Sequence, residues 1–191
     1  MKRLISIIVI LFCLTLLVSC DRAKIDIPET DEPETVAPET EWQEEEYPAD
    51  FQFSLTWNTY GISSYDSDTG KLVKTTDATN PEEYVTELHL TGEQKQLIWR
   101  AVSMLELDSY PDAPDNYDPY PNVKSDPSQT VILTVTYNGE SKTIQAKNIA
   151  LGGETLTRKA AVFLHVRDVI VSIIQETDEW KALPEYEFYY E

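Results

Sequence analysis

Hydrophobic and polar residues alternate with a period of two along several stretches after residue 50, which indicates strands with one buried face. The first stretch runs over residues 51–58 and directs four large side chains to the same face, namely Phe51, Phe53, Leu55 and Trp57. A hairpin is predicted next, with residues 63–66 and 71–74 as its strands. Gly70 ends the turn between them, because glycine readily adopts the positive φ that such turns need.

Two later stretches also predict strands. Residues 84–90 form a further strand, and four of its side chains share one face, namely Tyr84, Thr86, Leu88 and Leu90. Residues 130–137 and 140–147 give the strongest hairpin signal in the chain. Asn138 and Gly139 lie between them, and an Asn-Gly pair fits a two-residue type I′ turn.

A helical period replaces this alternation in two places. Thr91 and Gln94 resemble a capping box, so a helix is predicted from Thr91 to about Asp108. Its apolar stripe comprises Leu97, Ile98, Ala101, Val102 and Leu105, and Trp99 lies off that stripe. A longer helix is predicted over residues 155–175, after Gly152 and Gly153 end the preceding strand. The side chains expected to face the sheet are Val162, Val166, Val169, Ile170, Ile173 and Ile174.

The end of the chain adds one short element. Thr177 is predicted to cap a turn that holds Trp180 and ends at Pro184, and residues 186–190 alternate as an edge strand would. The collected order β-β-β-α-β-β-α predicts an α+β fold, with two helices packed on one face of an antiparallel sheet. Residues 51–191 have the size of a single domain.

The N-terminal segment has a different pattern. Lys2 and Arg3 precede an apolar run of roughly 15 residues, which is typical of a secretory signal peptide and too short for a comfortable membrane span. The run ends in Leu17, Val18, Ser19 and Cys20, which resembles the lipobox of bacterial lipoproteins. The whole layout is similar to bacterial lipoproteins that carry one small α+β domain, a resemblance of arrangement that assigns no activity.

The lipobox resemblance implies a lipid anchor on Cys20. In that family residues 1–19 are removed and the cysteine sulfur receives a diacylglyceryl group, whose two chains suffice for stable anchoring. The expected location is the extracytoplasmic face of the cell membrane, and Asp21 implies the inner membrane in a Gram-negative cell. A retained transmembrane anchor is the alternative. Because Cys13 lies in the removed segment, the mature chain has no free thiol and no disulfide.

Composition separates a tether from the domain. Residues 20–50 begin with the lipidated cysteine, and residues 21–50 hold twelve acids, two bases and four prolines, with a Pro-Glu-Thr triplet repeated every five residues. Such a segment buries too little apolar surface to fold, so a disordered acidic tether is predicted. Its expected reach is about 30 Å as a flexible coil and about 90 Å as an extended polyproline chain.

The mature chain is strongly acidic. Without residues 1–19 it keeps 34 acidic and 13 basic residues, a net charge of −21. This field repels phosphate backbones and anionic lipid headgroups, so we expect no nucleic-acid partner and no basic membrane-binding patch. Attraction of cations or of a basic protein stays open, although acidity that serves solubility is the simpler interpretation.

The long segment between residues 108 and 128 is the candidate binding surface. A loop of this length inside a compact domain usually has a functional use. It combines aromatic faces with carboxylates, which suits sugar stacking or capture of a basic peptide: Tyr110, Asp112, Asp115, Tyr117, Asp118 and Tyr120. Tyrosines that only fasten the loop to the body are the alternative, and the expected partners are an envelope glycan or a basic protein.

Catalytic groups are hard to find. His89 and His165 each stand alone among apolar neighbours, so neither is expected to act as a base, and no spacing predicts a zinc site. Residues 66–70 resemble the opening of a calcium loop, but the glycine comes fifth where an EF-hand has it sixth. No metal, cofactor or catalytic residue is therefore predicted.

Three functions remain open on these grounds. A binding module tethered to the membrane is favoured, because an anchor and a tether are clear whereas catalytic groups are not. A carboxylate-based hydrolase of the cell envelope is the alternative, and it would need two carboxyl groups about 5–9 Å apart in a pocket. A calcium-responsive domain is the third.

Overall fold

The structure is a computed structural model and describes residues 46–150 and 157–187. One antiparallel sheet has the strand order β4-β3-β2-β1-β5-β6. Its strands are β1 (Gln52–Trp57), β2 (Ser63–Asp66), β3 (Lys71–Val73), β4 (Val85–Glu87), β5 (Gln129–Tyr137) and β6 (Glu140–Ile149). The helices are η1 (Pro81–Tyr84), α2 (Gly92–Val102), η2 (Leu107–Ser109), α3 (Arg158–Gln175) and α4 (Asp178–Ala182). The predicted α+β class is confirmed.

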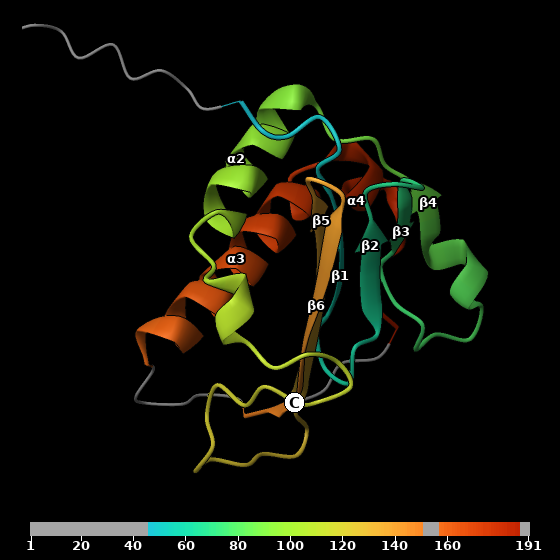
Figure 1. Cartoon of the computed structure of the whole chain (residues 1–191). Helices are drawn as coiled ribbons and strands as arrows, with labels where there is room; N and C mark the ends of the chain where they lie inside the picture. The colour runs from blue at the N-terminus through green and yellow to red at the C-terminus, as the bar shows by residue number, and fades with distance from the viewer. Residues whose placement is uncertain (1–45, 151–156, 188–191) are drawn as a thin grey trace, which may run out of the picture. The chain divides into compact units, whose positions relative to one another are not determined.

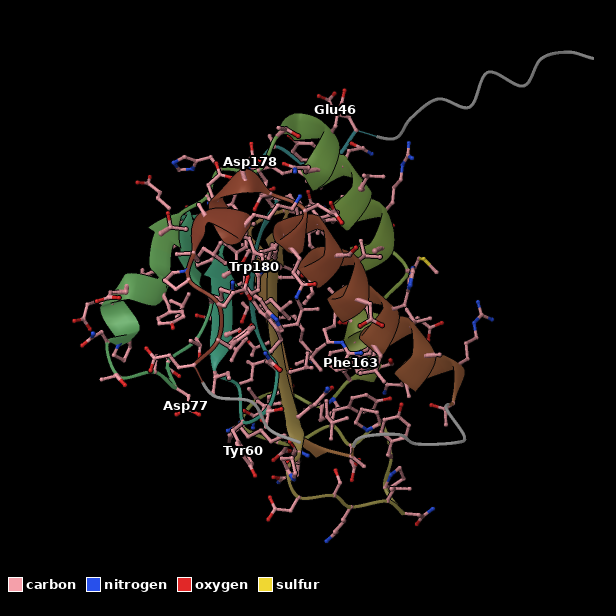
Figure 2. The ribbon with its side chains drawn as sticks, turned by 180° about the vertical axis from the view of Figure 1, so that it is seen from behind. Glu46, Tyr60, Asp77, Phe163, Asp178 and Trp180 are labelled. Atoms are coloured by element: carbon pink, nitrogen blue, oxygen red, sulfur yellow. The ribbon has the colours of Figure 1, made fainter. Side chains whose placement is uncertain are left out.

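Helices α2 and α3 lie side by side on one face of the sheet (Figure 1). The register of the two central strands sets Phe53 opposite Val135 and Leu55 opposite Leu133, so one face of β1 and β5 is continuously apolar. Every one of these four side chains is buried. Phe163 on α3, labelled in Figure 2, is fully buried and belongs to the same core. The core is therefore the layer between the sheet and the two long helices.

The predicted order β-β-β-α counts one strand too few before α2, although each of the observed strands there falls on a stretch that the alternation predicts. Four strands precede α2, because the hairpin and the stretch at 84–90 both join the sheet. Only residues 85–87 of that stretch pair as β4, since a 3₁₀ turn from Pro81 to Tyr84 leads into it. Of the four side chains predicted to share one face, Tyr84, Leu88 and Leu90 are buried and Thr86 is half-buried.

The predicted capping box of α2 is confirmed. The Thr91 hydroxyl accepts the Gln94 backbone N–H at 3.2 Å, and the Gln94 side-chain oxygen accepts the Thr91 N–H at 2.8 Å. The helix ends at Val102, however, six residues before Asp108. A short 3₁₀ turn replaces its last predicted turn.

The prediction that Leu97 belongs to the buried stripe of α2 is wrong. Leu97 is 50% exposed, because the buried stripe is centred on Ile98, Ala101 and Val102 and turns Leu97 outward. Trp99, which lay off the predicted stripe, packs edge-on against Phe51 at 5.0 Å between ring centres. The flank of α2 that carries Trp99 is therefore covered.

Residues 46–50, which the composition assigns to the tether, also lie against α2. The Tyr47 backbone N–H donates to the Gln96 side chain at 3.3 Å, which holds the segment against α2. The Asp50 carboxylate accepts the N–H groups of Asn138 at 3.0 Å and Gly139 at 2.8 Å. These two backbone hydrogen bonds lower the pKa of Asp50. The globular part thus includes residues before Phe51.

The C-terminal part has two helices where one was predicted. Thr157 caps α3 through the Ala160 N–H, and Thr177 caps α4 through the Trp180 N–H as expected. The buried face of α3 also includes Phe163 and Leu164, which the predicted stripe left out. The predicted glycine break at 152–153 and most of the predicted tail strand lie outside the described residues. Among the helices that the structure describes, none is both long and apolar enough to cross a bilayer.

Candidate functional site

The tyrosines of the candidate loop fasten it to the body of the domain. Tyr110 is 4% exposed and its hydroxyl donates to the Lys159 carbonyl at 3.0 Å. Tyr117 meets the Phe163 ring edge-on at 5.6 Å, and Tyr120 is half-buried against the same core. Burial raises the pKa of Tyr110 to about 12. These aromatic faces are therefore occupied by the protein itself.

The three aspartates of the loop are exposed but do not converge. Asp112 pairs with the Lys142 ammonium on β6. The Asp118 carboxylate accepts the Tyr120 backbone N–H at 2.9 Å and so braces the loop. Asp118 lines a separate hollow together with Tyr60. Of the predicted set, only Asp112 reaches the cavity described next.

A cavity of about 740 Å³ lies between the segment that follows α2 and the β5–β6 hairpin. The segment after α2 contributes Leu105, Glu106, Leu107, Asp108, Ser109 and Asp112. The hairpin contributes Val135, Tyr137, Glu140, Ser141 and Lys142. Four carboxylates and one ammonium thus line the same hollow, and its floor is apolar where Val135 and Leu105 are buried.

The Lys142 side chain forms one wall of the cavity. Its ammonium donates to the Tyr110 carbonyl at 3.0 Å as well as to Asp112. The side chain is only 19% exposed, whereas that of Asp112 is 85% exposed. Because Lys142 is engaged with the loop, the other three carboxylates have no cationic partner in the described part of the chain. The cavity therefore carries an excess of negative charge.

Sequence reasoning did not find this cavity. Glu106, Glu140 and Lys142 were not candidates, because they come from separate segments with no shared spacing. The Asn138-Gly139 turn did indicate part of the lining, because this turn places Glu140 opposite Tyr137. Nothing local indicates that the segment after α2 lies against that hairpin.

The other candidate chemistry stays isolated. His89 Nε2 lies 2.7 Å from the exposed Glu87 carboxylate, and His165 is exposed on α3. In the turn at 66–70 the Asp66 carboxylate accepts the Asp68 backbone N–H at 3.0 Å, as in an ordinary Asx turn. Within residues 46–150 and 157–187 no group of three or more His, Cys, Asp or Glu side chains is placed to hold a metal ion.

Comparison with known proteins adds no family. No protein-family model matches the chain, and no curated protein matches it.

Proposed function

We propose that this protein is a lipid-anchored extracytoplasmic binding module that captures a cationic segment of a protein partner in the cavity beside β6. The observation that carries the proposal is the lining of that cavity. Glu106, Asp108, Asp112 and Glu140 surround it, against the single ammonium of Lys142. A guest that brings lysine or arginine side chains would neutralise this excess charge.

The charge of the whole chain favours the same class of partner. A net charge of −21 in the mature chain attracts cationic segments over long range and raises the rate of encounter at low salt. Contacts between exposed charges contribute only about 0.2–1 kcal/mol each, so the affinity depends on several contacts acting together. Binding should therefore weaken as the salt concentration rises.

The sugar-binding alternative loses its main support in the geometry. Stacking of a glycan needs free aromatic faces, whereas Tyr110 is buried and Tyr117 packs on Phe163. The hydrolase alternative needs a general acid whose charged form is disfavoured by burial. Glu106, Asp108 and Asp112 are all exposed to solvent. A basic peptide is thus the partner that this cavity suits best.

The proposal is tested by binding of a lysine-rich peptide to the purified full-length protein in neutral detergent. Glu106→Gln combined with Asp108→Asn should weaken binding about 2- to 30-fold, because two exposed charge contacts are lost. The matched control is Glu82→Gln with Glu83→Gln, which removes two exposed acids before β4 at the opposite edge of the sheet. Equal losses in the two variants would mean that only net charge matters, which contradicts a defined site.

The anchor is tested separately. Cys20→Ala should abolish incorporation of a labelled fatty acid and leave residues 1–19 attached, because the sulfur is the acceptor that the lipobox resemblance implies. Ser19→Ala keeps a small residue before the cysteine and serves as the control that should still be labelled. Normal labelling of the Cys20→Ala protein would overturn the lipoprotein assignment.

A further inference from the structure

Strand β6 is an edge of the sheet, and only part of it is covered. It spans ten residues and pairs with β5 on one side. On the other side the loop covers its far half, where Tyr117 N–H donates to the Gln145 carbonyl at 2.8 Å. The Asn116 side chain also binds the backbone of Lys147. It accepts the Lys147 N–H at 2.6 Å and donates to the Lys147 carbonyl at 3.3 Å. Among residues 46–150 and 157–187, no backbone group pairs with residues 140–143 on that side, and the loop reaches this half only through the Lys142 side chain.

The register shows which backbone groups of the open half point outward. The two-residue turn makes Tyr137 and Glu140 a hydrogen-bonded pair, and such pairs alternate along an antiparallel ladder. Ser141 and Thr143 therefore occupy the non-hydrogen-bonded positions and direct their N–H and C=O groups away from β5. Gln145, two residues further on, does the same, and its outward carbonyl is the one that accepts Tyr117 N–H.

The backbone groups that point away from β5 in the open half of β6 have no hydrogen-bond partner among the described residues. In the described part of the chain, the backbone N–H and C=O groups of Ser141 and Thr143 bond to nothing on the side away from β5. Proteins usually protect such an edge by a covering loop, by proline or by a very short strand. The opposite edge, β4, has only three residues. The open half of β6 thus presents two donors and two acceptors in strand geometry.

The acidic cavity lies directly beside this open half. Glu140, Ser141 and Lys142 line it, so the cavity and the free edge share residues. Side chains alternate between faces along a strand, and Lys142 shares the face of the buried Ile144. The cavity is therefore on the helical side of the edge. A strand paired with Ser141 and Thr143 would direct every second side chain into it.

We propose that the open half of β6 receives an extended basic peptide, which joins the sheet as a seventh strand and places alternate Lys or Arg side chains in the acidic cavity. This inference rests on the proposed function and adds its geometry. Backbone pairing supplies affinity in this mode of recognition, and side-chain pockets supply specificity. The protein's own tether does not fit, because its twelve acids oppose two bases.

The test uses a ten-residue peptide of alternating lysine and valine, compared with the same peptide N-methylated at every second residue. N-methylation keeps the charge but removes backbone donors on one edge of the peptide. Because a pair of backbone hydrogen bonds is lost, the methylated peptide should bind about ten-fold more weakly or worse. A peptide methylated in the other register is the control, since its blocked edge faces away from β6 and its affinity should hold.

Variants of the protein test the same contact from the other side. Ser141→Pro removes an N–H that points outward and no hydrogen bond of the β5–β6 ladder, so the sheet should keep its pairing. It should weaken the unmethylated peptide about ten-fold or more, whereas Ser141→Ala, which keeps the backbone donor, should not. If Ser141→Pro fails to fold, the comparison of the two methylated registers still decides the question.

The outcomes separate the two proposals. Equal affinity for methylated and unmethylated peptides overturns strand pairing and leaves cationic capture in place. No binding of any lysine peptide overturns both. Sedimentation that shows a wild-type dimer and a Ser141→Pro monomer, without peptide binding, overturns the peptide inference in favour of pairing between two copies of β6. Sensitivity to one methylation register together with loss in Ser141→Pro supports the inference.

Discussion

The ammonium group of Lys74 lies 5.2 Å from the centre of the Trp180 ring, and Lys74 is only 3% exposed. A second aromatic ring, that of Tyr186, lies 5.4 Å from the same ammonium. The Leu183 carbonyl accepts a hydrogen bond from it at 3.4 Å. Residues 180–186 are thus held beside the end of β3 by a lysine that lies between two aromatic side chains. No carboxylate among the described residues pairs with this ammonium.

We expect Lys74→Met to change the free energy of unfolding by less than about 1 kcal/mol. Desolvation of an ammonium costs several kcal/mol. Contact with an aromatic face returns about 2 kcal/mol, and a hydrogen bond from a charged donor about 1.5–3 kcal/mol. These terms nearly cancel, and methionine keeps the unbranched stem against the rings. Denaturant unfolding of the two proteins measures the difference.

Trp180→Ala is the matched variant for that experiment. It should cost about 3–5 kcal/mol, because a buried ring 6.0 Å from the Trp57 ring is removed and leaves a void. A loss above about 2 kcal/mol in Lys74→Met would show instead that the ammonium makes a net stabilising contribution there.

Asp50 should make the stability of the domain depend on acid pH. Its carboxylate accepts the backbone N–H groups of Gly139 and Asn138, which lowers its pKa in the folded state. A lowered pKa contributes stability above the unfolded value of about 3.9, and that contribution is lost as pH falls through the folded value. We therefore expect the melting temperatures of wild type and Asp50→Asn to differ most above about pH 5 and to converge below about pH 4.

An exposed acid outside the Asn138-Gly139 turn provides the control for this experiment. Asp178→Asn removes another exposed acid whose side chain has no partner in the described chain. Its melting curve should keep the wild-type dependence on acid pH. A constant gap between wild type and Asp50→Asn from pH 3 to pH 7 would mean that the carboxylate charge does not stabilise the turn.

Gly70 and Gly139 should respond differently to alanine although their backbones match. Their φ angles are +73° and +75°, so alanine pays a similar strain of about 1–2 kcal/mol at either position. A Cβ atom at Gly139 would meet nothing within 4 Å. At Gly70 it would lie 2.9 Å from His89 Cε1 and 3.1 Å from the Leu88 carbonyl oxygen. Gly70→Ala should therefore be the more destabilising of the two.

A double variant shows how much of the destabilisation by Gly70→Ala comes from each of the two contacts, with His89 and with the Leu88 carbonyl. Adding His89→Ala to Gly70→Ala removes the movable ring but leaves the Leu88 carbonyl, which is backbone and cannot turn away. We expect partial recovery of the melting temperature. Complete recovery to the level of Gly139→Ala would mean that the carbonyl contact relaxes without cost.

Local signals in the sequence predicted most of the elements. The alternation from Phe53 to Trp57, the capping box at Thr91 and the Asn138-Gly139 turn each depend on residues that are close in sequence. Physical rules for strands, caps and turns act over that range, so these features could be predicted. The same range explains why the exposed Leu97 was placed in the stripe, since helical spacing alone does not tell which flank a neighbour covers.

Long-range packing accounts for what the sequence did not reveal. Trp99 is covered by the rings of Phe51 and Tyr137, which are both far from it in sequence, and Asp50 reaches a turn 88 residues away. The acidic cavity joins Glu106 to Glu140 across two segments that share no pattern. The tyrosines of the loop were identified as notable residues, but their burial against α3 depends on where that helix lies.

Tyr110 and Tyr65 should make the domain sensitive to alkaline pH. Burial raises the pKa of each hydroxyl to about 12, against an ordinary value of about 10. Between these values the unfolded chain releases protons that the folded chain keeps, so stability falls as pH rises from about 10 towards 12. The contribution is complete below pH 10, which places the whole effect on the alkaline side.

Tyr110→Phe isolates one of the two groups. At pH 8 it should lose only about 0.5–1.5 kcal/mol, because the hydrogen bond to the Lys159 carbonyl is removed while the ring stays buried. Without an ionisable hydroxyl, the variant should lose less stability than wild type above pH 10, so the two melting curves should converge as pH rises. Tyr65→Phe should behave alike, since its hydroxyl donates to the Leu88 carbonyl at 3.1 Å in the same buried manner. Parallel curves for wild type and both variants up to pH 12 would show that neither tyrosine remains protonated in the folded state.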